Sequence, residues 1–288
     1  MKYLIIIFLF VLAASPVFSQ FSGGSGVAGD EYLIGSKDDI YALIDSINAE
    51  PENNKFIDKH YKVIKNIRDS VRKPIPFFSG SWNGNGYKVT LAIKNYQKPT
   101  EYGKFGHYQN DVGLFAYILD AKISNIVVAG YVFSDSGYMQ FIGGIAGFTE
   151  TTEIYNCINL AKITSDHSCV GGIVGHTGYL KLDLYKITNS VNLGTINAVR
   201  SSDTNRIDKI SCIGGIIGHT MQHSFVKNTI NAGFINAMES ISYSAGRKLV
   251  SGIVGGSGKV DGTINIFNSI NVGIIKEKED RINGITNK

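Results

Sequence analysis

One pair of histidines has the spacing found in the metal-binding helix of zinc peptidases. His219 and His223 are four residues apart, but Thr220 stands where that motif carries its catalytic Glu. The pair directly follows a Gly-Gly-Ile-Ile-Gly segment that has no helical pattern, so the two rings need not share a face. His219 also aligns with His176 and Phe148 in neighbouring repeats. We therefore predict a row of stacked rings here, and no metal site.

Cleavage of polysaccharides would need clustered carboxylates, or a carboxylate-bound metal beside a basic residue. The adjacent pair Asp38 and Asp39 is explained by the start of a helix. Six other aspartates fall at unrelated positions of the repeat described below: Asp135, Asp166, Asp183, Asp203, Asp208 and Asp261. The sequence therefore predicts no catalytic residue and no cofactor, although a fold by itself does not exclude catalysis.

The three cysteines do not form the framework of a disulfide-rich protein. Cys169 and Cys212 occupy equivalent positions, where other copies of the repeat have Phe141 and Leu249. Large apolar residues at this position indicate two buried thiols. Their separation on adjacent turns would also permit a disulfide in an exported protein, so both alternatives remain open. Cys157 replaces a Ser or Thr of the other copies, and we expect it to be unpaired.

Two short motifs alternate through the second half of the chain. The first has the pattern Gly/Ser-Gly-Ile-x-Gly, and the second has the pattern Asn-x-Ile/Val-Asn. The central residues of the first are Ile145, Ile173, Ile216 and Ile253. The second begins at Asn156, Asn189, Asn228 and Asn268. Copies of the first motif are 28 to 43 residues apart, whereas the spacing within each motif is constant. Constant blocks between joins of variable length indicate a structural repeat.

Each repeat contains three short Ile/Val-rich segments separated by Gly or Asn, without a helical pattern. Such strands cannot bury a core alone, but stacked turns bury a continuous one. We therefore predict an all-β parallel β-helix over residues 111–288, with three strands per turn and equivalent positions about 4.8 Å apart. The four isoleucines should stack inward as one column. The four first asparagines should form another, because stacked amides can hydrogen-bond between turns.

Residues 30–110 are predicted to form an N-terminal cap and the first turns. The segment Ser36-Lys-Asp-Asp39 resembles a capping box, and it precedes apolar residues that share one helical face. These apolar residues are Ile40, Leu43, Ile44 and Ile47. The pattern predicts a short helix over residues 37–48 that covers the open end of the solenoid. Strands are expected over residues 61–67 and 87–93.

Residues 1–19 have the pattern of a secretory signal peptide. Lys2 supplies the positive charge, residues 3–14 are apolar, and Val17 and Ser19 are the small residues before a cleavage site at Gln20. A Gly/Ser-rich leader follows over residues 20–29, and no later segment is apolar enough to span a membrane. The chain has a formal charge of only +4, and its basic residues are not concentrated in one stretch, which argues against a nucleic-acid partner. We predict a secreted or cell-surface bacterial protein.

Several segments resemble a family of bacterial secreted repeat proteins. The opening Phe21-Ser-Gly-Gly-Ser-Gly26, the turn Phe78-Ser-Gly-Ser-Trp-Asn-Gly-Asn-Gly86, Gly113-Leu-Phe115 and the Gly-Gly-Ile-x-Gly copies are similar to GLUG-repeat proteins. The resemblance implies a right-handed β-helix of the kind found in adhesin-like proteins and in non-catalytic parts of immunoglobulin A peptidases. The sequence departs from the family pattern at two points. Glu31 stands where the family has Pro, and the sequence stops three residues past Ile285, within a repeat.

The joins that lead into the Gly-Gly-Ile motif differ in length. The joins that begin at Ile163 and Ile275 reach the next motif after eight residues. Those that begin at Ile196 and Ile235 reach it after 18 and 16 residues. The two long joins contain basic residues and one aromatic residue: Arg200, Arg206, Lys209, Tyr243, Arg247 and Lys248. Because binding residues concentrate on loops held by a rigid scaffold, we predict a shared surface here for an acidic or glycan partner. The alternative is drift in unconstrained loops.

Taken together, these features predict a non-catalytic adhesion or display protein that binds a glycan or a host or cell-surface protein. The alternative is a β-helical carbohydrate-active enzyme or a carbohydrate-binding module. A cluster of exposed acidic residues along one groove would favour the enzyme.

Overall fold

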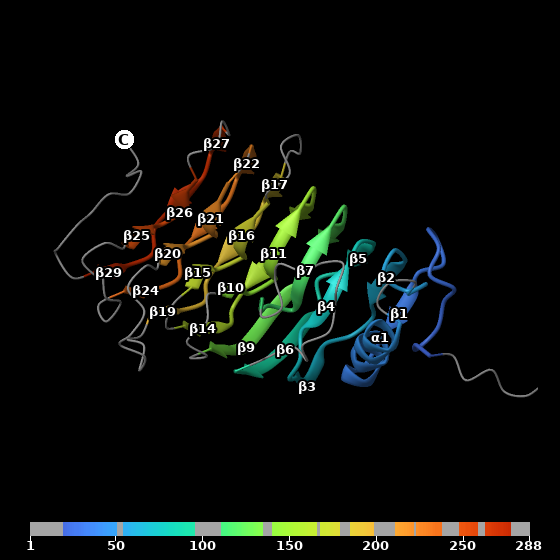
Figure 1. Ribbon diagram of the computed structural model, residues 1–288. Coiled ribbons are helices and arrows are strands. Elements are labelled where there is room, and N and C mark those ends of the chain that lie inside the picture. The colour runs from blue at the N-terminus through green and yellow to red at the C-terminus, as the bar shows by residue number, and fades with distance from the viewer. Residues whose placement is uncertain are drawn as a thin grey trace, which may run out of the picture.

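The computed structural model describes residues 20–50, 54–95, 111–134, 140–165, 168–178, 185–198, 211–221, 223–237, 248–258 and 263–277. Within these residues the strands of successive turns pair in parallel and stack into four sheets (Figure 1). The solenoid runs from the single described helix, α1 (Lys37–Ala49), at one end to the C-terminal strands at the other. The predicted parallel β-helix is therefore confirmed.

Two of the sheets form adjoining sides of the solenoid. Sheet 1 has eight strands in the order β1 (Tyr32–Ile34), β2 (His60–Val63), β5 (Ser81–Asn83), β8 (Lys122–Ser124), β12 (Glu153–Tyr155), β17 (Tyr185–Thr188), β22 (Ser224–Lys227) and β27 (Ile264–Phe267). Sheet 2 has six strands in the order β26 (Val254–Ser257), β21 (Ile217–Thr220), β16 (Val174–Thr177), β11 (Ala146–Glu150), β7 (Phe115–Leu119) and β4 (Ile75–Phe78).

The other two sheets complete each turn. Sheet 3 has eleven strands, nine of which follow the order β28 (Ile270–Asn271), β23 (Ile230–Asn231), β18 (Val191–Asn192), β13 (Ile158–Asn159), β9 (Val127–Ser134), β14 (Lys162–Ser165), β19 (Ile196–Ala198), β24 (Ile235–Ala237) and β29 (Ile275–Glu277). The other two strands branch from β9: β6 (Lys88–Lys94) pairs with β9, and β3 (Ile67–Val71) pairs with β6. Sheet 4 has four strands: β10 (Gln140–Gly143), β15 (Ser168–Gly171), β20 (Ser211–Gly214) and β25 (Lys248–Ser251).

One turn contains five strand segments, because small residues divide two of the three segments expected from the sequence. The Gly-Gly-Ile motif separates β15 from β16, and Gly194 separates β18 from β19. Close backbone approach requires glycine at such positions. A Cβ on Gly175 would lie 2.3 Å from the Ile142 nitrogen, and one on Gly194 would lie 2.1 Å from the Ala161 oxygen. The recurrent glycines therefore allow the backbones of adjacent turns to approach closely at these positions.

Isoleucines from the Gly-Gly-Ile motif fill the centre of the solenoid. Ile145, Ile173 and Ile216 are fully buried, and Ile253 on the last described turn is 4% exposed. Their backbones are joined from turn to turn: the Ile173 nitrogen donates to Ile216 at 3.0 Å, and the Ile216 nitrogen donates to Ile253 at 3.0 Å.

Replacing Ile216 by Ala should lower the free energy of unfolding by about 2–5 kcal/mol, because the side chain is enclosed between two equivalent isoleucines. Urea unfolding followed by circular dichroism measures the change. The matched control is Ile230→Ala on the outside of sheet 3, where the side chain is 38% exposed and should cost far less. Equal losses for the two variants would contradict the central column.

The N-terminal helix agrees with the sequence prediction in both position and capping. Ser36 is the N-cap: its Oγ accepts from the Asp39 nitrogen, and Asp39 Oδ2 accepts from the Ser36 nitrogen at 2.8 Å. The predicted apolar face is buried against β3 and β4: Ile40, Leu43, Ile44 and Ile47. The strand expected over residues 61–67 is instead divided into β2 and β3, whereas β6 matches the strand expected over 87–93.

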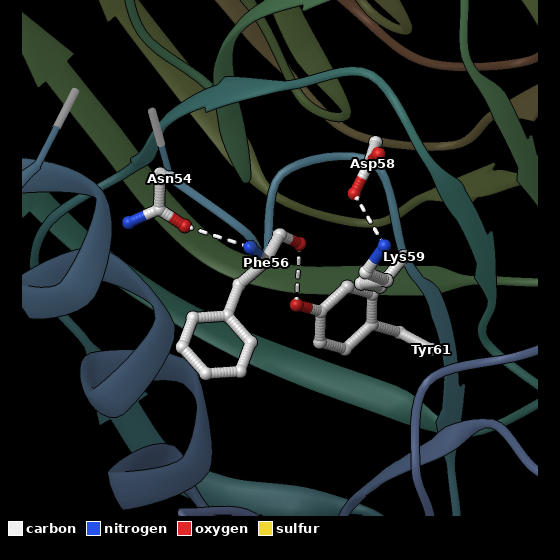
Figure 2. Close-up of polar contacts among 5 residues, drawn as sticks. All are labelled: Asn54, Phe56, Asp58, Lys59 and Tyr61. Atoms are coloured by element: carbon white, nitrogen blue, oxygen red, sulfur yellow. Dashed lines mark hydrogen bonds and ion pairs between the residues drawn. The ribbon is translucent and has the colours of Figure 1, made fainter. Parts of the chain in front are cut away.

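A polar loop joins the cap to the first turns (Figure 2). Asn54 Oδ1 accepts from the Phe56 nitrogen at 2.9 Å, and the Tyr61 hydroxyl donates to the Phe56 oxygen at 2.6 Å. Lys59 pairs with Asp58 at 3.0 Å in the same loop. The Tyr61 ring then stacks on Trp82, with a centroid distance of 5.6 Å, so the loop ties the cap to the aromatic core of the first turns.

Candidate functional site

The basic loops predicted from the sequence lie largely outside the described residues. Arg200, Arg206, Lys209, Tyr243 and Arg247 all fall in segments that the structure does not describe. Lys248 is the first residue of β25, on the strand that ends the second long join. The shared loop surface therefore stays a prediction.

The first asparagine of each Asn-x-Ile/Val-Asn motif lies at a surface corner and not in the interior. Asn156, Asn189, Asn228 and Asn268 are exposed, with φ between 48° and 55°. Side-chain amides bond between turns at some of these corners: Asn228 Nδ2 donates to Asn189 Oδ1 at 3.0 Å. The predicted bonding of these amides between turns is therefore present in part, but the expected inward direction is wrong, because the side chains are exposed at the corners.

The second asparagine of the motif, which the sequence analysis did not single out, forms the buried amide ladder. Asn159, Asn192 and Asn231 are fully buried. Asn159 Nδ2 donates to Asn192 Oδ1 at 2.8 Å, and Asn192 Nδ2 donates to Asn231 Oδ1 at 2.8 Å. The ladder ends where Asn231 Nδ2 donates to Asn271 Oδ1 at 2.6 Å. The Oδ1 of Asn192 also accepts from the Gly194 nitrogen at 3.1 Å. In the sequence, this second asparagine is present in all four copies of the motif, just as the first asparagine is.

The predicted row of rings is confirmed along sheet 2. Centroid distances are 5.3 Å from Tyr117 to Phe148, 5.2 Å from Phe148 to His176 and 4.9 Å from His176 to His219. Burial lowers the pKa of both imidazoles, that of His219 to about 4. His223 turns elsewhere, with its Nδ1 3.0 Å from the Thr263 hydroxyl. The zinc-peptidase spacing therefore does not bring these two imidazoles together.

The cysteines are buried, free thiols in the structure. Cys169 and Cys212 lie beside Phe141 and Phe148 in an apolar cluster that is separate from the central core. The neighbouring Cys212 thiol and burial together raise the pKa of Cys169, and burial raises the pKa of Cys157 to about 12. A catalytic or metal-binding cysteine needs the thiolate, so these environments oppose such chemistry.

Carboxylates in the described part of the chain are dispersed. No three His, Cys, Asp or Glu side chains in that part are placed to hold a metal ion. Asp111 is buried, which raises its pKa, and its Oδ1 accepts from the Phe141 nitrogen at 3.0 Å. Glu150 accepts from the Tyr117 hydroxyl at 2.6 Å. The six aspartates weighed in the sequence analysis lie outside the described residues.

The outer face of sheet 1 carries a regular array of basic and aromatic side chains. Its strands alternate buried residues such as Ile154 and Ile187 with outward residues in two columns. Strand register places Lys122, Glu153, Lys186, Phe225 and Asn265 in one column. The next column contains Tyr155, Thr188, Lys227 and Phe267. We call these nine residues the sheet 1 face.

Contacts within the sheet 1 face leave it with an excess of positive charge. Lys186 pairs with Glu153 at 2.8 Å, and this hydrogen bond lowers the pKa of Glu153. The Lys122 ammonium lies 5.2 Å from the centre of the Tyr155 ring. Lys227 is exposed beside Phe267, whose ring packs on Phe225 with a centroid distance of 5.5 Å. Three lysines against one glutamate suit an anionic partner, and the rings offer flat apolar contacts.

No family model matches the sequence, and neither does any curated protein. Among solved structures, the chain is similar to the crystal structure of a putative immunoglobulin A1 protease from Bacteroides ovatus. The TM-score is 0.59 with 16% sequence identity, over 90% of this chain and 70% of the other. At this identity the likeness supports the β-helix fold alone. Within the described residues, no helix is long and apolar enough to cross a membrane.

Proposed function

We propose that this chain is a non-catalytic exported β-helix that serves adhesion or display, and that it binds an acidic glycan through the sheet 1 face. The observation that carries the proposal is the regular basic and aromatic array on that face. The ammonium groups would pair with carboxylate or sulfate groups, while the rings pack on sugar rings. The signal-peptide pattern of residues 1–19 and the resemblance to GLUG-repeat proteins support an extracellular role.

The proposal predicts weaker binding when the exposed charges and ring are removed. The variant Lys122→Gln/Lys227→Gln/Phe267→Ala should bind an acidic polysaccharide at least about tenfold more weakly, a change of about 1.4 kcal/mol in binding free energy. The protein from Gln20 onward is first screened on an array of acidic and neutral glycans, and affinities for the best acidic ligand are then measured by calorimetry. Binding should also weaken as salt rises.

The matched control is Lys162→Gln, which removes an exposed lysine from sheet 3 instead of sheet 1. It should leave the affinity unchanged. Equal binding of neutral and acidic glycans, or full affinity of the triple variant, would refute the sheet 1 face as the site. A basic loop site would be revealed by loss of binding on shortening residues 199–210 and 238–247 while the triple variant still binds.

A second candidate is an enzyme, because the structurally similar protein is described as a protease. The described residues offer a weak basis for it, since burial raises the pKa of Cys157 and of Cys169 and so disfavours the reactive thiolate, and no three His, Cys, Asp or Glu side chains among those residues could hold a metal ion. Incubation of the mature chain with immunoglobulin A1 and with acidic polysaccharides, followed by electrophoresis, tests this directly. Cleavage of either substrate would favour the enzyme over the adhesin.

A further inference from the structure

A second face of the solenoid carries aliphatic side chains at the same place on five successive turns. These residues lie on or just after the first short strand of each sheet 3 turn. One column contains Val127, Ile158, Val191, Ile230 and Ile270, and the second contains Leu160, Leu193, Ala232 and Val272. We call these nine residues the apolar stripe. Leu160, Leu193 and Ile230 are 42%, 49% and 38% exposed, and Ile270 and Val272 on the last described turn are 48% and 62% exposed.

The apolar stripe follows from the buried amide ladder. Asn192 points inward, so strand alternation directs its neighbours Val191 and Leu193 outward, about 7 Å apart. The turns are joined in register by backbone hydrogen bonds, such as that from the Leu193 nitrogen to the Asn159 oxygen at 2.8 Å. Five turns at about 4.8 Å spacing give a straight ridge roughly 20 Å long.

The size and surroundings of the stripe are those of a protein interface. It exposes on the order of 500 Å² of apolar surface, in the upper range for a single patch on a monomer. Over these five turns neither column contains a charged residue, and the register continues the first column to Lys88 on the preceding turn. One edge is formed by the uncharged corner amides Asn156, Asn189, Asn228 and Asn268. The exposed Lys162 lies at the other edge, and an apolar centre with a polar rim is the usual anatomy of a contact between proteins.

We propose that the apolar stripe binds the same stripe of a second copy of this chain, in a two-fold symmetric dimer. Flat sheet faces with regular aliphatic ridges pack on one another at about 10 Å, and this chain provides such a face with matching repeat and length. The stripe together with its rim approaches the roughly 800 Å² per partner that a stable interface buries. Basic residues do flank the stripe, with Lys162 two residues after Leu160 and Lys227 next to Asn228, so an anionic membrane surface is the competing occupant that the vesicle test below addresses.

The two-fold axis passes near the middle of the stripe, at Val191 and Leu193. Residues there face their own counterparts in the second copy, whereas Val127 at one end faces Ile270 at the other. This orientation leaves the sheet 1 face of each copy outside the interface. The dimer is independent of the proposed function, and it would double the number of binding faces on one particle.

Sedimentation equilibrium of the protein from Gln20 onward tests the dimer. The wild type should be dimeric at micromolar concentration, and Leu160→Lys/Leu193→Lys should raise the dimer dissociation constant at least about 100-fold, because each lysine would be buried against apolar partners. Thr188→Lys on sheet 1 is the matched control and should remain dimeric. Thermal unfolding establishes that all three proteins are folded.

The orientation is tested by cross-linking with a bismaleimide that spans about 10 Å. Leu193→Cys should yield a covalent dimer, whereas Thr188→Cys and the wild type, whose own thiols are buried, should not. A wild type that stays monomeric at 100 µM, or a dimer that the two lysines leave unchanged, would overturn the proposal. Flotation of a monomeric protein with lipid vesicles would overturn it in favour of a membrane surface.

Discussion

Replacing Asn192 by Ala should lower the free energy of unfolding by about 4–5 kcal/mol. The substitution removes the amide that accepts from Asn159, accepts from the Gly194 nitrogen and donates to Asn231. Losing a buried hydrogen bond costs about 1–3 kcal/mol, and the lower part of that range applies because Asn159 Nδ2 still donates to the Ala161 oxygen and Asn231 Oδ1 still accepts from the Gly233 nitrogen; three losses of about 1.5 kcal/mol give the expected sum. That sum is a large share of the stability of a typical domain. Urea unfolding monitored by circular dichroism measures the loss.

Two companion variants keep the ladder prediction testable if Asn192→Ala does not fold. Asn271→Ala, at the partly buried end of the ladder, removes the bond from Asn231 and a longer one to the Gly273 oxygen, and it should cost about 1–2 kcal/mol. Asn189→Gly, at an exposed corner where φ is 49°, should be close to neutral because glycine adopts this conformation readily. A larger loss at Asn189 than at Asn271 would show that the corner asparagines carry the stability.

The double variant His176→Phe/His219→Phe should be more resistant to acid than the wild type. Phe148 already occupies the equivalent position on the preceding turn, so the column accepts a phenyl ring. Burial lowers the pKa of both imidazoles, that of His219 to about 4. The unfolded chain therefore binds protons that the folded chain excludes. Stability from neutral imidazoles is complete above pH 6.5 and falls as the pH drops toward 4.

The expected loss from His219 alone is about 3 kcal/mol between pH 6.5 and pH 4. Urea midpoints measured at steps from pH 8 to pH 4 should show the wild type and the double variant diverging below pH 6.5. Asp111, whose raised pKa acts in the opposite direction, is common to both proteins and cancels in the difference. His60→Phe, outside the ring column, serves as the control. Parallel pH profiles for wild type and double variant would contradict the buried imidazoles.

Local signals in the sequence were sufficient for the cap and for the class of fold. Helix α1 begins at its capping box because Ser36 and Asp39 satisfy each other's backbone nitrogens, an interaction within four residues. The repeat spacing of the Gly-Gly-Ile motif required equivalent residues to stack. Blocks of constant spacing between joins of variable length have few other solutions when the segments are short, apolar and rich in glycine.

The surface that could bind a partner was not determined by local signals. The lengths of the joins predicted a binding surface at residues 199–210 and 238–247, which are local segments. The basic and aromatic array of sheet 1 is instead spread over five turns. Lys122 and Lys227 are 105 positions apart in the sequence, and parallel stacking alone places them on one face. Residues that are distant along the chain acquire a common surface only when the register between turns is known.

The asparagines separate most clearly what the sequence determined from what the tertiary structure decided. The constant spacing of the motif predicted a ladder at its first asparagine and none at its second. The fold decided that Asn192 points inward and Asn189 outward, because Asn189 takes the left-handed conformation at the corner and strand alternation resumes after it. Side-chain direction depends on where the chain bends, and the bend depends on the neighbouring turns against which Gly194 and Gly175 pack.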